Sequence, residues 1–310
     1  MHDFHSQTSN PRFGLRAKLP LHFSRPALWF CCPVVIALFL LTTCASGAEY
    51  RLQNSSPKVQ PSPTTLIDAT VHNTSQVIHV FVALCDNINQ GIVPVPAALG
   101  NGDDPARNLY WGAGFGVKTF FSKERNWSLV AHISNPRSAV LERVIFKHSS
   151  GAYMVADAYQ GAQIKQTTFD FLNASAGAGG ETIRFTESGN DHAINAGGES
   201  NLLVYVGHDG LMDFSLSAFP KQKDNRVREA VILACASKSY FKKPLRETGA
   251  TPLLWTTNLM APEAYVLGAA LNAWLTKQPP EEVRKQAAVA YNKYQHCGVK
   301  AALNLFATGW

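Results

Sequence analysis

The sequence of 310 residues lacks several motifs that commonly reveal an enzyme class. It has no G-x-S-x-G elbow, which disfavours a serine hydrolase of that kind. Gly112, Gly114 and Gly116 do not have the G-x-G-x-x-G spacing of a dinucleotide site, and they do not directly follow a predicted strand. The histidines are scattered without the spacing of a zinc loop or a metal-binding helix, so we predict no metal site and no cofactor.

Charge is also scarce, because charged residues make up only 16% of the chain and no long run of lysine and arginine occurs. About half of the net charge of +6 lies in residues 1–30, which hold four basic residues against one acid: Arg12, Arg16, Lys18, Arg25 and Asp3. Since aromatic residues do not interleave with bases in the remainder, we predict no nucleic-acid partner. Hydrophobic residues make up 46% of the chain, enough to bury a core.

Long apolar runs are absent except near the N-terminus. There an apolar stretch over residues 26–41 follows the basic residues and gives way to small residues. This arrangement predicts an export signal over residues 1–48 and a secreted or periplasmic mature protein. The stretch is shorter than the ~20 apolar residues of a membrane span, although an uncleaved anchor stays an alternative. The only other route to a membrane is a lipid at Cys44, since Leu41-Thr-Thr-Cys44 loosely matches a lipobox.

Cysteine is rare in the chain that would remain after export. Cys85, Cys235 and Cys297 are left, and because three is an odd number at least one is free or paired outside the chain. A disulfide between any two of them stays open at this point. A bridge between Cys85 and Cys235 would exclude a catalytic role for Cys235.

Residues 49–75 are rich in Ser, Pro, Thr and Asn and are interpreted as a linker, so that residues 76–310 form a single domain. Apolar runs predict buried strands within residues 77–85, 201–210, 229–237 and 252–258. A strand pair, or a strand and a helix, is expected at 127–133 and 139–146. Helices are expected from Asp103, over 151–162, over 262–275, and from Pro279 to about His296 with Gly298 as its stop. This alternation predicts an α/β fold, a three-layer sandwich with a central, mainly parallel sheet.

Two of the expected strands end in residues that can carry chemistry. The run Asn201-Leu-Leu-Val-Tyr-Val-Gly-His208 ends in a histidine, and Glu229-Ala-Val-Ile-Leu-Ala-Cys235 ends in a cysteine. If the two strands are parallel neighbours, His208 and Cys235 share the edge at which open α/β sheets bind ligands. A base beside a thiol can raise the thiolate fraction, which is the minimal unit for nucleophilic catalysis. The alternative is that Cys235 is a small apolar residue at the end of a core strand.

At these two segments the chain resembles the caspase-like cysteine peptidases, the group that includes legumains, gingipains and metacaspases. In that group an apolar strand ends in His-Gly, and the next ends in a small or acidic residue followed by the nucleophilic cysteine. The matching segments are Leu202-Leu-Val-Tyr-Val-Gly-His-Asp-Gly210 and Val231-Ile-Leu-Ala-Cys-Ala-Ser237. The chain departs from the pattern in having Asp209 between the histidine and the glycine, and in an interval of only 27 residues from His208 to Cys235.

The resemblance covers residues 77–275 and implies the caspase-like fold and a polypeptide substrate. It implies that Cys235 attacks a peptide carbonyl and that His208 favours the attack and protonates the leaving amine. The backbone amides of Cys235 and Gly210 become candidate oxyanion donors. Asp209 and Ser237 are candidates for lining the cleft or orienting His208, with ordinary turn chemistry as the alternative.

The function that we expect is therefore that of an exported caspase-like cysteine hydrolase, a peptidase with a His/Cys dyad. The alternative is a non-catalytic exported binding or cell-envelope protein on the same α/β scaffold. The sequence alone leaves open whether the chain is an enzyme.

Overall fold

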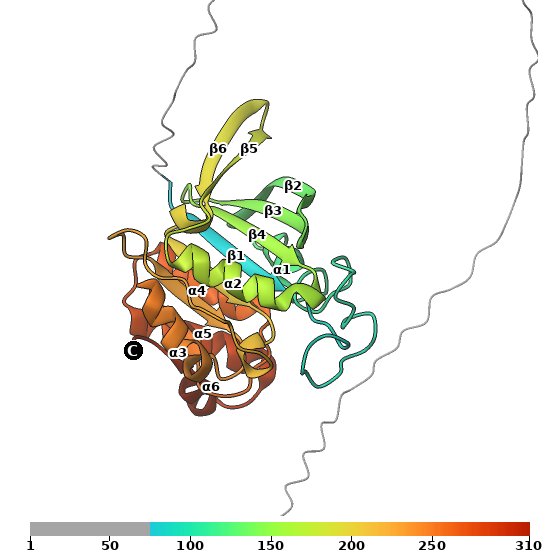
Figure 1. The fold of residues 1–310 in the computed structure, drawn as a ribbon, viewed down its shortest axis with the longest axis vertical. Coiled ribbons are helices and arrows are strands. Elements are labelled where there is room, and N and C mark those ends of the chain that lie inside the picture. Colours follow the sequence, from blue (N-terminus) through green and yellow to red (C-terminus); the bar gives the residue numbers. More distant parts are fainter. Residues whose placement is uncertain (1–74) are drawn as a thin grey trace, which may run out of the picture. The chain divides into compact units, whose positions relative to one another are not determined.

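A mixed sheet of eight strands forms the centre of the part of the chain that the computed structural model describes, residues 75–310 (Figure 1). Its strands are β1 (Val77–Ala83), β2 (Trp127–Arg137), β3 (Val140–His148), β4 (Tyr153–Tyr159), β7 (Leu202–Val206), β8 (Glu229–Leu233), β9 (Thr251–Thr256) and β10 (Phe306–Ala307). They lie in the order β10-β9-β8-β7-β1-β4-β3-β2. The strands from β9 to β4 in this order pair in parallel, whereas β10 at one edge and β3 and β2 at the other are antiparallel.

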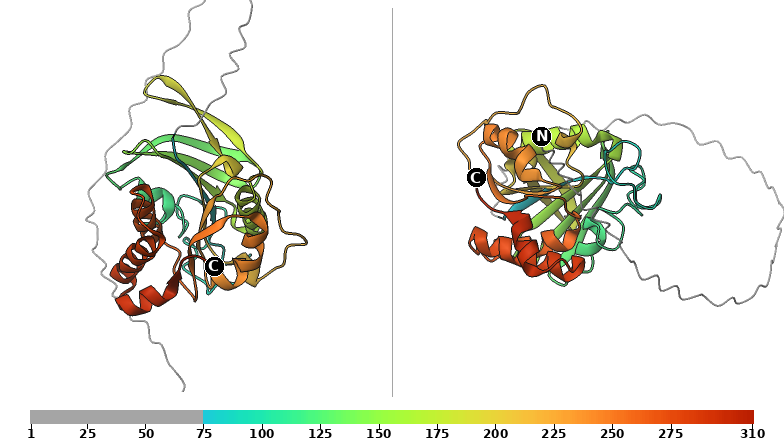
Figure 2. Two further views of the ribbon diagram at one scale, coloured as in Figure 1. Left: turned by 90° about the vertical axis from the view of Figure 1, so that its left-hand side faces the viewer. Right: turned by 90° about the horizontal axis from the view of Figure 1, so that it is seen from below.

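Helices cover both faces of the sheet, so the described residues form three layers (Figure 2). The helices are α1 (Val117–Phe121), α2 (Ile164–Ser175), α3 (Ser237–Thr248), α4 (Ala264–Leu275), α5 (Pro280–Gln295) and α6 (Val299–Leu305). Helices α2 and α3 pack on one face, and α1, α4, α5 and α6 contribute to the core on the other. The predicted α/β class with a largely parallel sheet is therefore confirmed. No helix within residues 75–310 is long and apolar enough to span a membrane.

The sequence of the central strands explains why they are covered on both sides. All seven residues of β1 are buried, and alternate residues face opposite layers. Ile78, Val80 and Val82 join the core beneath α4 and α5, whereas Phe81 and Ala83 join the core beneath α2 and α3. Parallel strands buried on both faces have near-continuous apolar runs of this kind.

A separate antiparallel hairpin of β5 (Glu181–Glu187) and β6 (Asn190–Ala196) projects from the molecule at the top of Figure 1. Apolar residues on one of its faces, among them Ile183 and Ile194, pack against Val77, Ile145 and Val155 of the main sheet. Val77 begins β1, so the hairpin contacts the amino-terminal end of that strand. The predicted functional residues lie at the opposite, carboxyl-terminal ends of the strands.

Several sequence predictions require correction. Residues 151–162 do not form the predicted helix, because Tyr153–Tyr159 form strand β4, where Ala156 and Ala158 are fully buried in the middle of the sheet. The helix predicted from Asp103 is replaced by a series of turns. Asp104 does accept a bond from the Ala106 amide (3.1 Å). However, the side chain of Asn108, four residues after Asp104, is buried and donates to the carbonyl of Cys85, two residues after β1 (2.8 Å).

Other predictions are confirmed. The strand expected at 77–85 is β1, and the pair of undecided type at 127–146 is the antiparallel pair β2 and β3. The last two long helices are α4 and α5, as expected. However, α5 ends at Gln295, and its C-cap residue His296 adopts the left-handed conformation (φ 52°), two residues before Gly298. The predicted export signal over residues 1–48, Cys44 and the linker apart from residue 75 lie outside the described residues.

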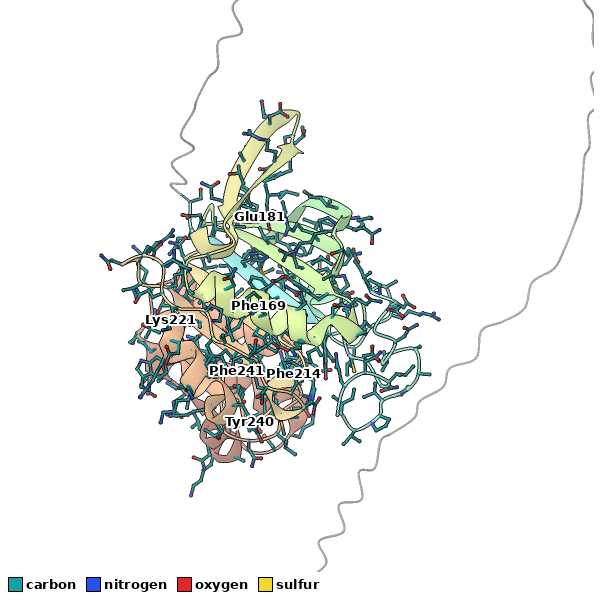
Figure 3. The ribbon with its side chains drawn as sticks, in the orientation of Figure 1. Phe169, Glu181, Phe214, Lys221, Tyr240 and Phe241 are labelled. Carbon is teal, nitrogen blue, oxygen red and sulfur yellow. The ribbon has the colours of Figure 1, made fainter. Side chains whose placement is uncertain are left out.

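The short interval between His208 and Cys235 is possible because no α-helix lies between β7 and β8. A 3₁₀ turn over Gly210–Met212 is followed by an extended loop that crosses the layer of α2 and α3. Phe214 in this loop packs on the same core as Phe241 of α3, and both are labelled in Figure 3. The loop amide of Lys223 donates to the carbonyl of Ala176 just after α2 (2.8 Å). An anchored loop thus replaces the crossover helix that parallel strands usually need.

Gly207 lets the chain leave β7 close to the end of β1. Its φ is +145°, and a Cβ atom there would lie 2.8 Å from the carbonyl oxygen of Ala83. The backbone conformation and the close approach together require glycine. This requirement fixes the position of the next residue, His208.

We predict that Gly207→Ala lowers the free energy of unfolding by about 2 kcal/mol or more, because the strained backbone and the contact with Ala83 act together. Gly151→Ala is the matched control, since Gly151 also has a positive φ (+88°) but no neighbouring atom within 4 Å of the added Cβ. It should cost about 1 kcal/mol from backbone strain alone. Urea unfolding followed by circular dichroism measures both values, and equal losses would contradict the close approach.

Candidate functional site

His208 and Cys235 stand at equivalent positions on neighbouring parallel strands. The last pair between β7 and β8 is Val206 with Leu233. His208 follows Val206 by two positions, and Cys235 follows Leu233 by two positions. Adjacent strands lie about 4.8 Å apart, so this register brings the two residues side by side. Val206 and Leu233 both face the core beneath α4 and α5.

Both residues line one cavity of about 290 Å³ at the carboxyl-terminal edge of the sheet. Its walls come from the loops after β1, β7, β8 and β9, and its lining consists of Gly91, Ile92, Val93, Tyr110, Gly207, His208, Met212, Cys235, Leu259, Met260 and Pro262. This is the edge at which open α/β sheets bind their ligands. The structure therefore places the two residues in one cavity, as the sequence predicted from the strand ends.

Asp213 orients the imidazole of His208. Its Oδ2 lies 2.7 Å from His208 Nε2 and also accepts a bond from the Gly91 amide (2.9 Å). Because a carboxylate can only accept, Nε2 carries the proton and Nδ1 is left as the basic nitrogen. The Tyr205 hydroxyl donates to the carbonyl of His208 (2.8 Å) and holds its backbone. Sequence analysis missed Asp213, because the 3₁₀ turn that brings it back to His208 has no recognisable motif.

The Cys235 thiol is half-buried and contacts the loop after β9. Its Sγ lies 3.5 Å from the carbonyl oxygen of Met260 and accepts a bond from the Met260 amide (3.4 Å). Burial raises the pKa of the Cys235 thiol above its usual value, an effect that the Met260 amide partly opposes and the nearby Asp209 reinforces. Among the hydrogen bonds of residues 75–310, none joins His208 to Cys235. The thiol is therefore neutral at physiological pH in this arrangement.

Cys235 sits in a strained turn at the start of a helix. The next residue, Ala236, adopts the left-handed conformation (φ 47°, ψ 30°), which is costly for a residue with a Cβ. Strain of this kind concentrates at functional sites. Helix α3 begins directly afterwards, and its positive end favours a thiolate at Cys235. Within the described part of the chain the Cys235 N–H makes no hydrogen bond, so it is available to an incoming oxyanion.

The other two cysteines occupy different surroundings. Cys85 at the end of β1 is fully buried, and desolvation raises its pKa to about 11. Tyr110, whose ring lines the cavity, makes a side-chain hydrogen bond with Cys85. Cys297 is exposed, and all three thiols are free. Within residues 75–310 no disulfide therefore joins Cys235 to Cys85 or Cys297, the possibility that the sequence left open.

The remaining predicted site residues have structural hydrogen bonds. Asp209 accepts a bond from the Leu211 amide (3.0 Å) and so starts the 3₁₀ turn. The Gly210 N–H donates a hydrogen bond to the Tyr205 hydroxyl and is therefore already paired. Ser237 is fully buried, and its hydroxyl donates to the carbonyl of Ile232 (3.0 Å). None of these three residues lines the cavity, and the bonds of Asp209 and Ser237 are those of ordinary turn and strand ends.

Asp209 is nevertheless unusual, because it is fully buried and its Oδ2 has no hydrogen-bond partner. Desolvation raises the pKa of this carboxyl to about 7, and the charge of Asp213 adds to the effect. A buried carboxyl with an unpaired oxygen is expensive to ionise. Asp209 therefore changes its charge near neutral pH, close to the thiol of Cys235.

A second cluster of ionisable groups lies away from this cavity. His79, Asp157 and Glu181 have ligand-type atoms within 4.8 Å of one another, and they are the group among residues 75–310 that a metal could join. Arg143 already occupies it, because its guanidinium bonds Asp157 (2.6 and 2.7 Å) and Glu181 (2.6 and 3.0 Å). Burial alone would raise the pKa of Asp157, but the hydrogen bonds from Arg143 and His79 hold this pKa below its usual value. We interpret the cluster as an ion-pair network that joins β1, β3, β4 and the base of the hairpin, where Figure 3 labels Glu181.

Comparisons of the chain with models of protein families, with curated proteins and with solved structures found no match. The function is therefore argued from the site.

We predict that Asp209→Asn alters the pH dependence of stability. The raised pKa means that the folded protein holds a proton which the unfolded chain releases, so stability falls as pH rises from about 4 to about 7. Asparagine keeps the bond to Leu211 but does not titrate. Between pH 4 and pH 8 the native chain should lose up to about 4 kcal/mol relative to the variant. Urea unfolding across this range measures the difference, the exposed Asp191→Asn variant controls for charge removal, and parallel curves would contradict the burial effect.

Proposed function

We propose that this protein is an exported cysteine hydrolase of the caspase-like kind, a peptidase in which Cys235 is the nucleophile and His208 its acid–base partner. The observation that carries the proposal is the equivalent placement of the two residues at the carboxyl ends of β7 and β8, inside one cavity. The mainly parallel sheet with helices on both faces suits the resemblance that the sequence carries. The proposed export rests on the sequence of residues 1–48.

The proposed reaction needs only groups at this site. The thiol proton of Cys235 passes to Nδ1 of His208 as Sγ attacks the peptide carbonyl carbon, and the carbonyl electrons move to its oxygen. The resulting imidazolium protonates the departing amine, which leaves a thioester on Cys235. Water then hydrolyses the thioester, with His208 accepting a proton from the water, and the thiol is restored. Asp213 holds the imidazole and stabilises its charged form in both stages.

The developing oxyanion finds one donor in place. This donor is the Cys235 N–H, which makes no backbone hydrogen bond in the described residues and belongs to the same residue as the attacking sulfur, next to the start of α3. Donors of this kind supply a large share of catalysis in acyl transfer. The Gly210 amide, which the resemblance also suggests, would first have to leave the Tyr205 hydroxyl.

One observation favours the second candidate, a non-catalytic binding or envelope protein. The thiol of Cys235 has a raised pKa and bonds Met260, not His208. A structural cysteine would look like this. In the catalytic proposal, Sγ leaves its contact with Met260 and the thiol proton passes to His208 as the attack on a peptide carbonyl or another electrophile begins.

Replacement of either member of the dyad should abolish hydrolysis while leaving the fold intact. We predict that Cys235→Ala and His208→Gln each reduce peptide cleavage by about a thousandfold or more. Cleavage is measured by mass-spectrometric mapping of new amino termini after incubation with a proteome-derived peptide library. Cys297→Ala, which removes an exposed thiol, is the control and should retain full activity. Cleavage that persists in Cys235→Ala would rule out the proposed nucleophile.

Asp213 should act through His208 as a positioning residue. Asp213→Asn keeps the size of the side chain but can present its amide N–H to Nε2, which favours the tautomer with the proton on Nδ1. We predict a fall in kcat of about a hundredfold or more with little change in KM. An Asp213→Glu variant should recover part of the loss. A change confined to KM, or no rescue, would instead indicate that Asp213 only holds the Gly91 loop.

A further inference from the structure

We infer that the cavity at Cys235 receives an uncharged, apolar side chain, so that the chain cleaves after apolar residues. The inference rests on the proposed function, and it names the substrate class of the same site.

The lining of the cavity provides the first argument. Apart from His208 and Cys235, every lining residue is apolar, glycine or tyrosine, and no Lys, Arg, Asp or Glu is among them. The apolar character continues to the surface, where large hydrophobic residues stand exposed to solvent. Val93 is 86% exposed, Leu259 68% and Met212 41%. Together with Ile92, Met260 and Pro262 they form an apolar rim around the sulfur.

The neighbouring carboxylates do not line the cavity. Asp213 is engaged by His208 and by the Gly91 amide. Asp209 is fully buried and does not line the cavity. A charged side chain that entered would lose part of its hydration without gaining a partner of opposite charge. The same lining offers no cation that could hold an acidic side chain.

The position of the rim argues that its occupant is part of the substrate. Leu259 and Met260 belong to the loop whose amide and carbonyl contact the Cys235 sulfur. On the other wall, Ile92 and Val93 follow Gly91, which bonds the residue that orients His208. A peptide whose carbonyl lies on Cys235 therefore places the side chain of that same residue against these two loops. Burial of an apolar side chain there would be favourable, because it removes apolar surface from water.

Covalent probes separate this inference from the proposed function. Three tripeptidyl acyloxymethyl ketones carry the same two alanines followed by Leu, Asp or Lys next to the reactive ketone. Intact mass and peptide mapping of the full-length protein give the rate at which each probe modifies Cys235. We expect the Leu probe to react at least about tenfold faster than the Asp and Lys probes, because their charged side chains would enter the cavity without a partner of opposite charge.

A preference for Lys or Asp, or equal rates for the three probes, would overturn the inference and leave the proposed nucleophile in place. A preference for Lys would mean that a carboxylate such as Asp209 reaches the cavity after all. If no probe modifies Cys235 although iodoacetamide does, both the inference and the peptidase proposal are overturned.

A charge introduced on the rim provides a second test. Leu259→Lys changes an exposed residue and should leave the fold intact. It should slow the Leu probe by about fivefold or more and speed the Asp probe, because it supplies the missing cation. Val289→Lys on α5, where Val289 is 51% exposed, is the matched control and should leave all three rates unchanged. Equal rates in Leu259→Lys and the native chain would contradict a role for the rim.

Discussion

The parallel pairing of β7 with β8 is the interaction on which the candidate site depends. It sets His208 and Cys235 at the same height on neighbouring strands, and the edge of the sheet leaves both facing a cavity. Gly207 supports this placement, because only glycine allows the chain to pass so close to Ala83 at the end of β1. Asn108 in turn ties the loop that carries Tyr110 to Cys85, so three strand ends contribute to one site.

The scarcity of charge is the second property that shapes the site. Burial works against the thiolate of Cys235 and against the carboxylate of Asp209, and each charge would further disfavour the other. The start of α3 and the Met260 amide act in the opposite direction. In the free protein the sulfur of Cys235 is therefore held as a neutral thiol. On this account the attacking thiolate exists only together with the imidazolium of His208, and an apolar substrate side chain completes the exclusion of water.

The sequence was sufficient for the features that depend on local pattern. Continuous apolar runs identified β1, β7, β8 and β9, and their carboxyl ends led to His208 and Cys235. It failed where tertiary contacts decide: the alanines of β4 take their strand conformation from burial between layers, and Asn108 draws the segment after Asp103 into turns. Asp213 could not be found, because only the folded 3₁₀ turn brings it to His208. The buried state of Asp209 likewise depends on residues distant in sequence.

The central claim is that His208 and Cys235 act as one unit, and the rate of alkylation of Cys235 tests it most directly. Limiting iodoacetamide is applied to the folded protein and to His208→Gln at neutral pH, and peptide mapping gives the rate for each cysteine. If His208 accepts the thiol proton, Cys235 in the native chain should react about tenfold faster than in His208→Gln, with Cys297 as the internal reference. Equal rates for Cys235 in the two proteins, or no modification in either, would contradict the dyad.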